Sequence, residues 1–181
     1  MPSHLMKLLI GATIWAVLAF VFICISLFTQ DWVDIGISGV SGSVGIFPWQ
    51  CVSSNTCNVF WDTADGWDKC FFFLMLFAFI FQFFALITAA VALFIPRFRY
   101  KFTHHFCGTQ GLITVLLIAE LILYGIEYDR NLGGLENIPG VSVTLGYSYW
   151  QSLAAAIFST VAVMIGGAAA KRARHHDCEC Y

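Results

Sequence analysis

Two cysteines in the first half of the chain, Cys51 and Cys57, lie close together in a segment without helical periodicity. Such a pair can form a disulfide, which persists in oxidising compartments and cross-links chain that buries little surface. Cys70 can instead take one of them as its partner and leave the other free, because sequence alone does not determine connectivity. We predict the Cys51–Cys57 bridge, and the pairing with Cys70 stays open as the alternative.

Carboxylates around these cysteines form the second group of residues that can do chemistry. Acidic groups attract cations, and rings of acidic side chains select cations in channels. The alternative is that the carboxylates only solvate the segment that carries them, and both interpretations stay open. The five candidates for charge selectivity, of which the last three are the most closely spaced, are Asp31, Asp34, Asp62, Asp65 and Asp68.

Enzyme chemistry finds no support in the sequence. There is no Gly-rich phosphate loop, no HExxH pair and no candidate Ser-His-Asp set. Metal-ligand atoms occur near the end of the chain in His175, His176, Cys178 and Cys180, but a short tail is a poor cage for an ion. We therefore expect no enzyme activity, no cofactor and no bound metal.

Four apolar segments must position these residues. The chain is 59% hydrophobic and 11% charged, whereas soluble proteins carry roughly 25% charged residues. Each segment is long enough to cross a membrane as a helix, which takes about 20 residues. The segments cover residues 8–28, 70–95, 106–126 and 147–170. We predict a mainly α membrane protein with one domain, a bundle of four transmembrane helices packed on one another.

Positive charge predicts how the bundle lies in the membrane, because cytosolic loops are enriched in lysine and arginine. Seven basic residues share one side of the predicted topology: Lys7, Arg97, Arg99, Lys101, Lys171, Arg172 and Arg174. Both termini are therefore predicted to be cytosolic. The predicted cytosolic parts include residues 96–105 and 171–181, and the predicted outer loops are residues 29–69 and 127–146. The outer loops are acidic, so a nucleic-acid partner is not expected.

Polar side chains within the apolar segments are costly in a membrane, so we expect each to have a hydrogen-bond partner or a functional role. For Gln82 we expect a hydrogen bond to a neighbouring helix, and for Glu120 the same, with a functional carboxylate as the alternative. Small residues four apart in the last segment let helices approach closely, and we expect them to pack within one bundle rather than at a dimer seam. They are Ser152, Ala156 and Thr160, and separately Gly166 and Ala170.

The first outer loop has the pattern of short strands. Alternating apolar residues predict one strand over 32–37, and further strands are predicted over 44–47 and 58–61. Ser38-Gly39 and Ser41-Gly42-Ser43 are typical of turns. We expect a small extracellular antiparallel sheet from this loop, to which the second outer loop can contribute, and an irregular loop held by the disulfide is the alternative.

This loop resembles that of the claudin and peripheral myelin/epithelial membrane protein superfamily, whose signature is Trp, then Gly-Leu-Trp, then two cysteines. The matching residues, in the same order, are Trp32, Gly45, Ile46, Phe47, Cys51 and Cys57. The four spans and the longer first outer loop are also similar. Ile46-Phe47 stands where the family has Leu-Trp, and the cysteine spacing is shorter, which is typical of a divergent, for example invertebrate-type, member.

The resemblance implies a protein of cell junctions in the plasma membrane. It would associate with itself, in the same membrane and across to the facing cell, and with related claudin-like proteins, to form or regulate a paracellular barrier or cation-preferring pore. An auxiliary subunit that modulates a channel or receptor is the alternative function within the superfamily, and adhesion without a pore is a third.

The predicted cytosolic tail offers three further hypotheses. Its basic start can contact the anionic lipid of the bilayer. Cys178 and Cys180 can be palmitoylated. The carboxylate of Tyr181 can enter the groove of a cytosolic PDZ scaffold, although Cys180-Tyr181 differs from the usual aromatic-Val ending of claudins. The alternative is a solvated tail that only sets topology.

Overall fold

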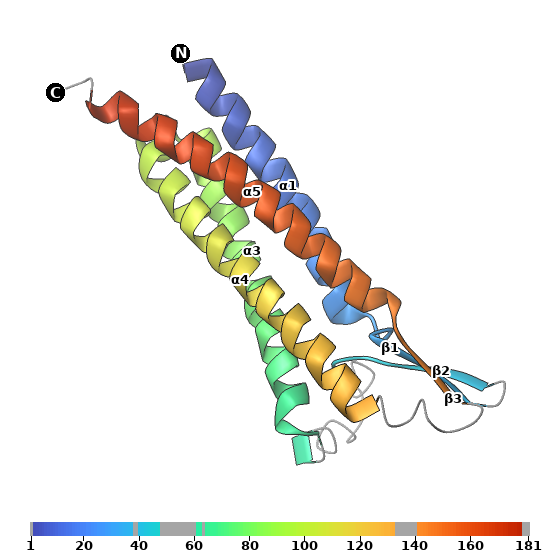
Figure 1. Ribbon diagram of the computed structural model, residues 1–181. Coiled ribbons are helices and arrows are strands. Elements are labelled where there is room, and N and C mark those ends of the chain that lie inside the picture. The colour runs from blue at the N-terminus through green and yellow to red at the C-terminus, as the bar shows by residue number, and fades with distance from the viewer. Residues whose placement is uncertain (1, 38–39, 48–60, 63, 133–140, 179–181) are drawn as a thin grey trace.

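The computed structural model describes residues 2–37, 40–47, 61–62, 64–132 and 141–178 of the chain. Four long helices dominate it: α1 (Pro2–Phe28), α3 (Gly66–Phe94), α4 (Arg99–Leu132) and α5 (Tyr147–Cys178). They form an elongated bundle in which α1 lies beside α5 and α3 beside α4, and the N- and C-terminal ends lie together at one end (Figure 1). A small sheet lies at the opposite end, which we call the sheet end.

All four helices are long and apolar enough to cross a membrane. They extend beyond the predicted apolar segments, so that residues 66–69, 99–105, 127–132 and 171–178, predicted as loop or tail, are helical. The apolar pattern marks the part of a helix that suits hydrocarbon, whereas backbone hydrogen bonds continue into polar sequence until a breaker occurs. Pro96 is such a breaker: Ile95 before it is extended, and a short 3₁₀ helix, η2 (Pro96–Phe98), links α3 to α4.

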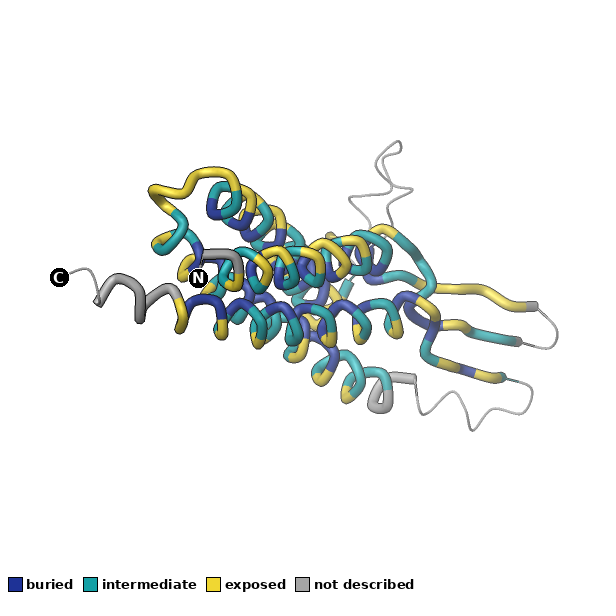
Figure 2. Tube along the Cα trace, turned by 90° about the horizontal axis from the view of Figure 1, so that it is seen from above, coloured by how far each residue is buried: buried dark blue, intermediate teal, exposed yellow. Residues whose placement is uncertain are grey.

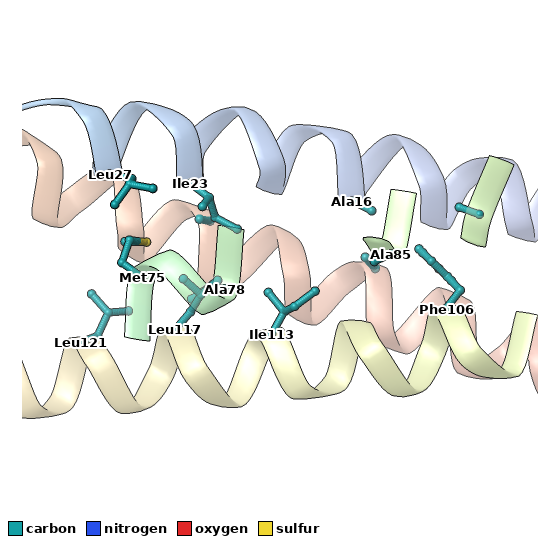
Figure 3. Packing of buried hydrophobic residues seen from close by; sticks show 14 of the residues in the cluster. Ala16, Ile23, Leu27, Met75, Ala78, Ala85, Phe106, Ile113, Leu117 and Leu121 are labelled. Carbon is teal, nitrogen blue, oxygen red and sulfur yellow. The ribbon is translucent and has the colours of Figure 1, made fainter. Parts of the chain in front are cut away.

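Small and aliphatic side chains fill the centre of the bundle. Figure 3 shows Ile23 and Leu27 of α1 directed toward Met75 of α3 and Leu117 of α4, and all four are completely buried. Buried residues lie along the inner sides of the helices and exposed ones along the outer sides (Figure 2). The exposed outer side chains are largely apolar, as expected where lipid replaces water.

Four of the five predicted small residues of α5 are buried and Thr160 is half-buried, which fits packing within one chain. Ser152, Ala156, Gly166 and Ala170 are buried. A Cβ on Gly166 would lie 3.3 Å from the ring of Phe106 on α4, closer than most side chains can approach. Small residues here let the helix backbones come together, which maximises dispersion contacts where no hydrophobic force acts.

A polar network in the middle of the bundle joins all four helices, and we call it the glutamine network. Gln82 Nε2 on α3 donates to the Ala16 carbonyl of α1 at 3.0 Å and to Gln110 Oε1 of α4 at 3.2 Å. Gln110 Nε2 donates back to Gln82 Oε1 at 3.0 Å and to Ser159 Oγ of α5 at 2.8 Å. The predicted interhelical role of Gln82 is confirmed, and its partner Gln110 was not foreseen.

Three antiparallel strands make up the sheet: β1 (Val33–Ile37) in the centre, β2 (Val40–Val44) on one side and β3 (Val141–Leu145) on the other. In the register, Asp34 pairs with Ser43 of β2 and with Thr144 of β3. The first predicted strand is therefore confirmed, and the second outer loop contributes the third strand.

Two strand predictions within the first loop need correction. The second strand covers Val40–Val44 rather than 44–47, so Ser41-Gly42-Ser43, predicted as a turn, is paired with β1. Residues 45–47 leave the sheet because Phe47 packs on α3. Its ring stacks on that of Phe72, with the two ring centroids 4.6 Å apart. Trp61, predicted to end a third strand, is helical, and the rest of that stretch and the Ser38-Gly39 turn lie outside the described residues.

Candidate functional site

Trp32, the first residue of the family signature, anchors the sheet to the bundle. Its side chain is completely buried, and its indole Nε1 donates to the Ser26 carbonyl in the last turns of α1 at 2.9 Å. The ring packs against Tyr124 of α4 and Tyr149 of α5, with centroids 4.9 and 6.4 Å apart. A buried tryptophan with its N–H satisfied contributes both a large apolar area and a fixed orientation. This one side chain therefore contacts three of the four helices at the start of β1.

Hydrogen bonds join the entry to β1 and the exit from β3. The Gly146 amide donates to the Trp32 carbonyl and the Ser148 amide to the Asp31 carbonyl, each at 2.8 Å. Ser26 Oγ donates to the Ser148 carbonyl, also at 2.8 Å. A Cβ on Gly146 would collide with the Asp31 carbonyl group, so only glycine permits this approach. The sheet is thus fixed to the junction of α1 and α5 by hydrogen bonds that backbone carbonyls accept.

The Gly45-Ile46-Phe47 part of the signature holds the other edge. Ile46 and Phe47 are buried, and Phe47 also contacts the ring of Trp61, with centroids 6.1 Å apart. A Cβ on Gly45 would come within 2.8 Å of the Gln30 backbone, which explains a glycine here. Cys51 and Cys57 lie outside the described residues, so their disulfide stays a prediction.

The two faces of the sheet differ in polarity. Val33 and Val143 are buried on the face toward the helices, and the Val143 carbonyl accepts a hydrogen bond from the Tyr128 hydroxyl of α4 at 2.8 Å. The opposite face, which we call the polar face, is exposed and carries hydroxyl groups around one carboxylate. Its residues are Asp34, Ser41, Ser43, Ser142 and Thr144. Asp34 lies on the central strand and is the charged residue among them.

The remaining predicted carboxylates do not share that face. Asp62 is exposed in a helical turn before α3, and Asp65 and Asp68 are exposed at the start of α3. Asp31 is half-buried, and its backbone carbonyl accepts a hydrogen bond from the Ser148 amide of α5. The structure therefore places Asp34 on the polar face and Asp62, Asp65 and Asp68 elsewhere. Those three are the most closely spaced candidates in the sequence.

A cleft of about 300 Å³ separates the apolar face of the sheet from the ends of α3 and α4. Sheet residues, among them Val33 and Val44, line one wall, and Phe71 of α3 and Tyr124 of α4 line the other. Asp68 and Glu127 also line it, and Asp68 interacts electrostatically with Glu127. Two acidic groups thus lie beside an apolar space. We call it the acidic cleft.

Sequence reasoning missed the α4 contribution to this site. Tyr124, Glu127 and Tyr128 occupy positions i, i+3 and i+4 on one face of α4, and all three line the cleft. That spacing was available in the sequence. It went unused because residues from 127 onward were taken as loop.

Glu120 lies deeper in α4, completely buried, and its expected bond to a neighbouring helix is confirmed. Ser152 Oγ of α5 donates to Glu120 Oε2 at 3.0 Å. The other oxygen, Oε1, is buried without a hydrogen-bond partner among the described residues. Glu120 and Ser152 therefore act as a single polar contact between α4 and α5.

These features define a class: a multi-pass membrane protein in which a four-helix bundle supports a small antiparallel sheet at one end. The family model described as tight junction protein, claudin-like, matches residues 3–180. The chain therefore belongs to the claudin-like tight junction protein family. No curated protein matches the sequence.

Proposed function

We propose that this protein joins neighbouring cells by self-association and forms a paracellular barrier whose conductance prefers cations. The observation that carries the proposal is the polar face of the sheet, with Asp34 exposed among hydroxyl groups. A carboxylate in such a place attracts cations and repels anions without binding either tightly. In the predicted orientation this face lies outside the cell.

The sheet also suits assembly from many copies. Strands β2 and β3 are its two edges, and edge strands carry backbone groups that can pair with another chain. Pairing of copies in one membrane would place their polar faces side by side, and contact with the facing cell would close the space between them. Ion passage would then follow the row of Asp34 carboxylates.

Charge neutralisation in an epithelial layer tests the proposal. Cells with few junctions of their own would express the wild type, Asp34→Asn, or the control Asp62→Asn, whose carboxylate is also exposed but lies off the sheet. We expect the wild type to accumulate at cell contacts and raise transepithelial resistance. Dilution potentials should show the Na⁺/Cl⁻ permeability ratio falling at least about twofold in Asp34→Asn, as loss of a charge near permeating ions predicts.

Equal effects of Asp34→Asn and Asp62→Asn would contradict the role of the polar face. Uniform surface distribution with unchanged resistance would overturn the junction function. Co-purification with a channel or receptor would then favour an auxiliary subunit.

The tail adds two proposals about partners. Cys178 ends α5, and palmitoylation of Cys178 and Cys180 would attach the tail to the bilayer. Docking of Tyr181 in a PDZ groove would connect the protein to a cytosolic scaffold.

A further inference from the structure

We propose that the acidic cleft is a binding site for a small organic cation, a molecule with an ammonium group on a compact apolar body. The site differs from the polar face in position and in chemistry. It lies on the helix-facing side of the sheet, whereas Asp34 points to the opposite side. The proposal concerns a bound ligand and stands whether or not the protein selects permeating ions.

The size and lining of the cleft fit such a ligand. Its volume of about 300 Å³ lies at the lower end of the range of small-molecule pockets. The sheet contributes aliphatic side chains, including Val33, Ile35 and Val44, and the helices contribute the rings of Phe71 and Tyr124. Apolar walls with a few polar groups are typical of ligand sites.

Charge complementarity decides the sign of the ligand. Among the residues that the structure describes, Asp68 of α3 and Glu127 of α4 are the charged residues that line the cleft, and both are acidic. Aromatic rings attract cations through their negative faces, so Phe71 and Tyr124 favour the same charge. An anion would meet two carboxylates, and a neutral molecule would gain only apolar contact. An inorganic cation would leave the apolar walls unused, which is why we commit to an organic one.

The position of the cleft gives binding a mechanical consequence. Its walls belong to the sheet, α3 and α4, and Tyr124, which lines it, also packs against Trp32 at the base of β1. A ligand in the cleft would connect the sheet to the helix ends. Occupancy should therefore stabilise the folded protein, because a ligand that binds only the folded state shifts the unfolding equilibrium.

Benzylammonium and benzyl alcohol form a matched pair of probes, with the same ring and arm but different charge. The full chain, purified in detergent micelles, would be titrated with each by saturation-transfer NMR and by calorimetry. We expect saturable binding of benzylammonium, at least about tenfold tighter than any binding of benzyl alcohol, and a higher unfolding temperature with the cation. Equal affinity for both probes, or no saturable binding of the cation, would overturn the proposal.

Three variants locate the site. Asp68→Asn and Glu127→Gln remove one charge each while keeping the shape, and each should weaken benzylammonium binding at least about tenfold, because each removes a charge-assisted contact with the ammonium group. Asp34→Asn, which removes an equal charge from the opposite face, should bind like wild type. A matching loss in Asp34→Asn would mean that only the general field of the protein acts, and would contradict a site in the cleft. Unchanged binding in both cleft variants would do the same.

Discussion

The middle of the bundle and its sheet end solve the same problem, holding helices together, by different physics. In the middle, amides of Gln82 and Gln110 form hydrogen bonds that reach all four helices. At the sheet end, Trp32 buries a large ring against two tyrosines and makes one hydrogen bond. Lipid surrounds the middle of the bundle, so no hydrophobic force drives its helices together. Interhelical hydrogen bonds and close packing must hold them instead. Near the sheet end water is present, so burying aromatic rings there again contributes hydrophobic stabilisation.

Truncation of the aromatic anchor should have the largest effect. Trp32→Ala removes a completely buried ring and leaves a cavity, and we expect the free energy of unfolding to fall by about 3–5 kcal/mol. Denaturation in mixed detergent micelles would measure this. Trp150→Ala is the control, because Trp150 is 54% exposed on the bundle surface. A loss of similar size in both variants would mean that the anchor role of Trp32 is wrong.

Disruption of the glutamine network should have an intermediate effect. Gln110→Leu removes one partner each from Gln82 and Ser159, which keep the Ala16 carbonyl and the Thr114 hydroxyl as partners, and we expect a loss of about 1–2 kcal/mol in the same assay. The double variant Gln82→Leu/Gln110→Leu should lose less than the sum of the two single variants, because no amide is then left unpaired. Strict additivity would show that the two amides do not act as a unit.

Glu120 should be the least sensitive of the buried positions. Glu120→Gln keeps an oxygen that accepts from Ser152 and removes a group that is costly to bury if charged. We expect the free energy of unfolding to stay within about 0.5 kcal/mol of wild type or to rise. A loss near that of Gln110→Leu would show that the carboxyl has a role that an amide cannot replace.

Several parts of this architecture could be predicted from the sequence, and others could not. The four spans followed from apolar length, the first strand from alternation at residues 33–37, and the role of Gln82 from the cost of a polar group in hydrocarbon. The second strand was misplaced because Ser41-Gly42-Ser43 has turn composition, yet pairing with β1 satisfies its backbone. Local propensity was overridden there by tertiary contact.

The residues of the cleft show the same limit. Sequence spacing groups Asp68 with Asp62 and Asp65, but of these three described residues only Asp68 lines the cleft. The register of β1 turns Asp34 to the polar face, and the end of α4 brings Glu127 to Asp68. These pairings link residues far apart in the chain, which no local pattern encodes.

The sequence by itself therefore determined the membrane class, the number of helices and the resemblance to claudins, because these depend on the type and order of nearby residues. Only the tertiary structure decided the third strand of the sheet, the burial of Trp32 between α4 and α5, and the division of the carboxylates between two faces. The physical reason is that burial and charge interaction depend on distance in space, and a helix bundle brings together residues that lie over a hundred positions apart, as Ser26 and Ser148 do.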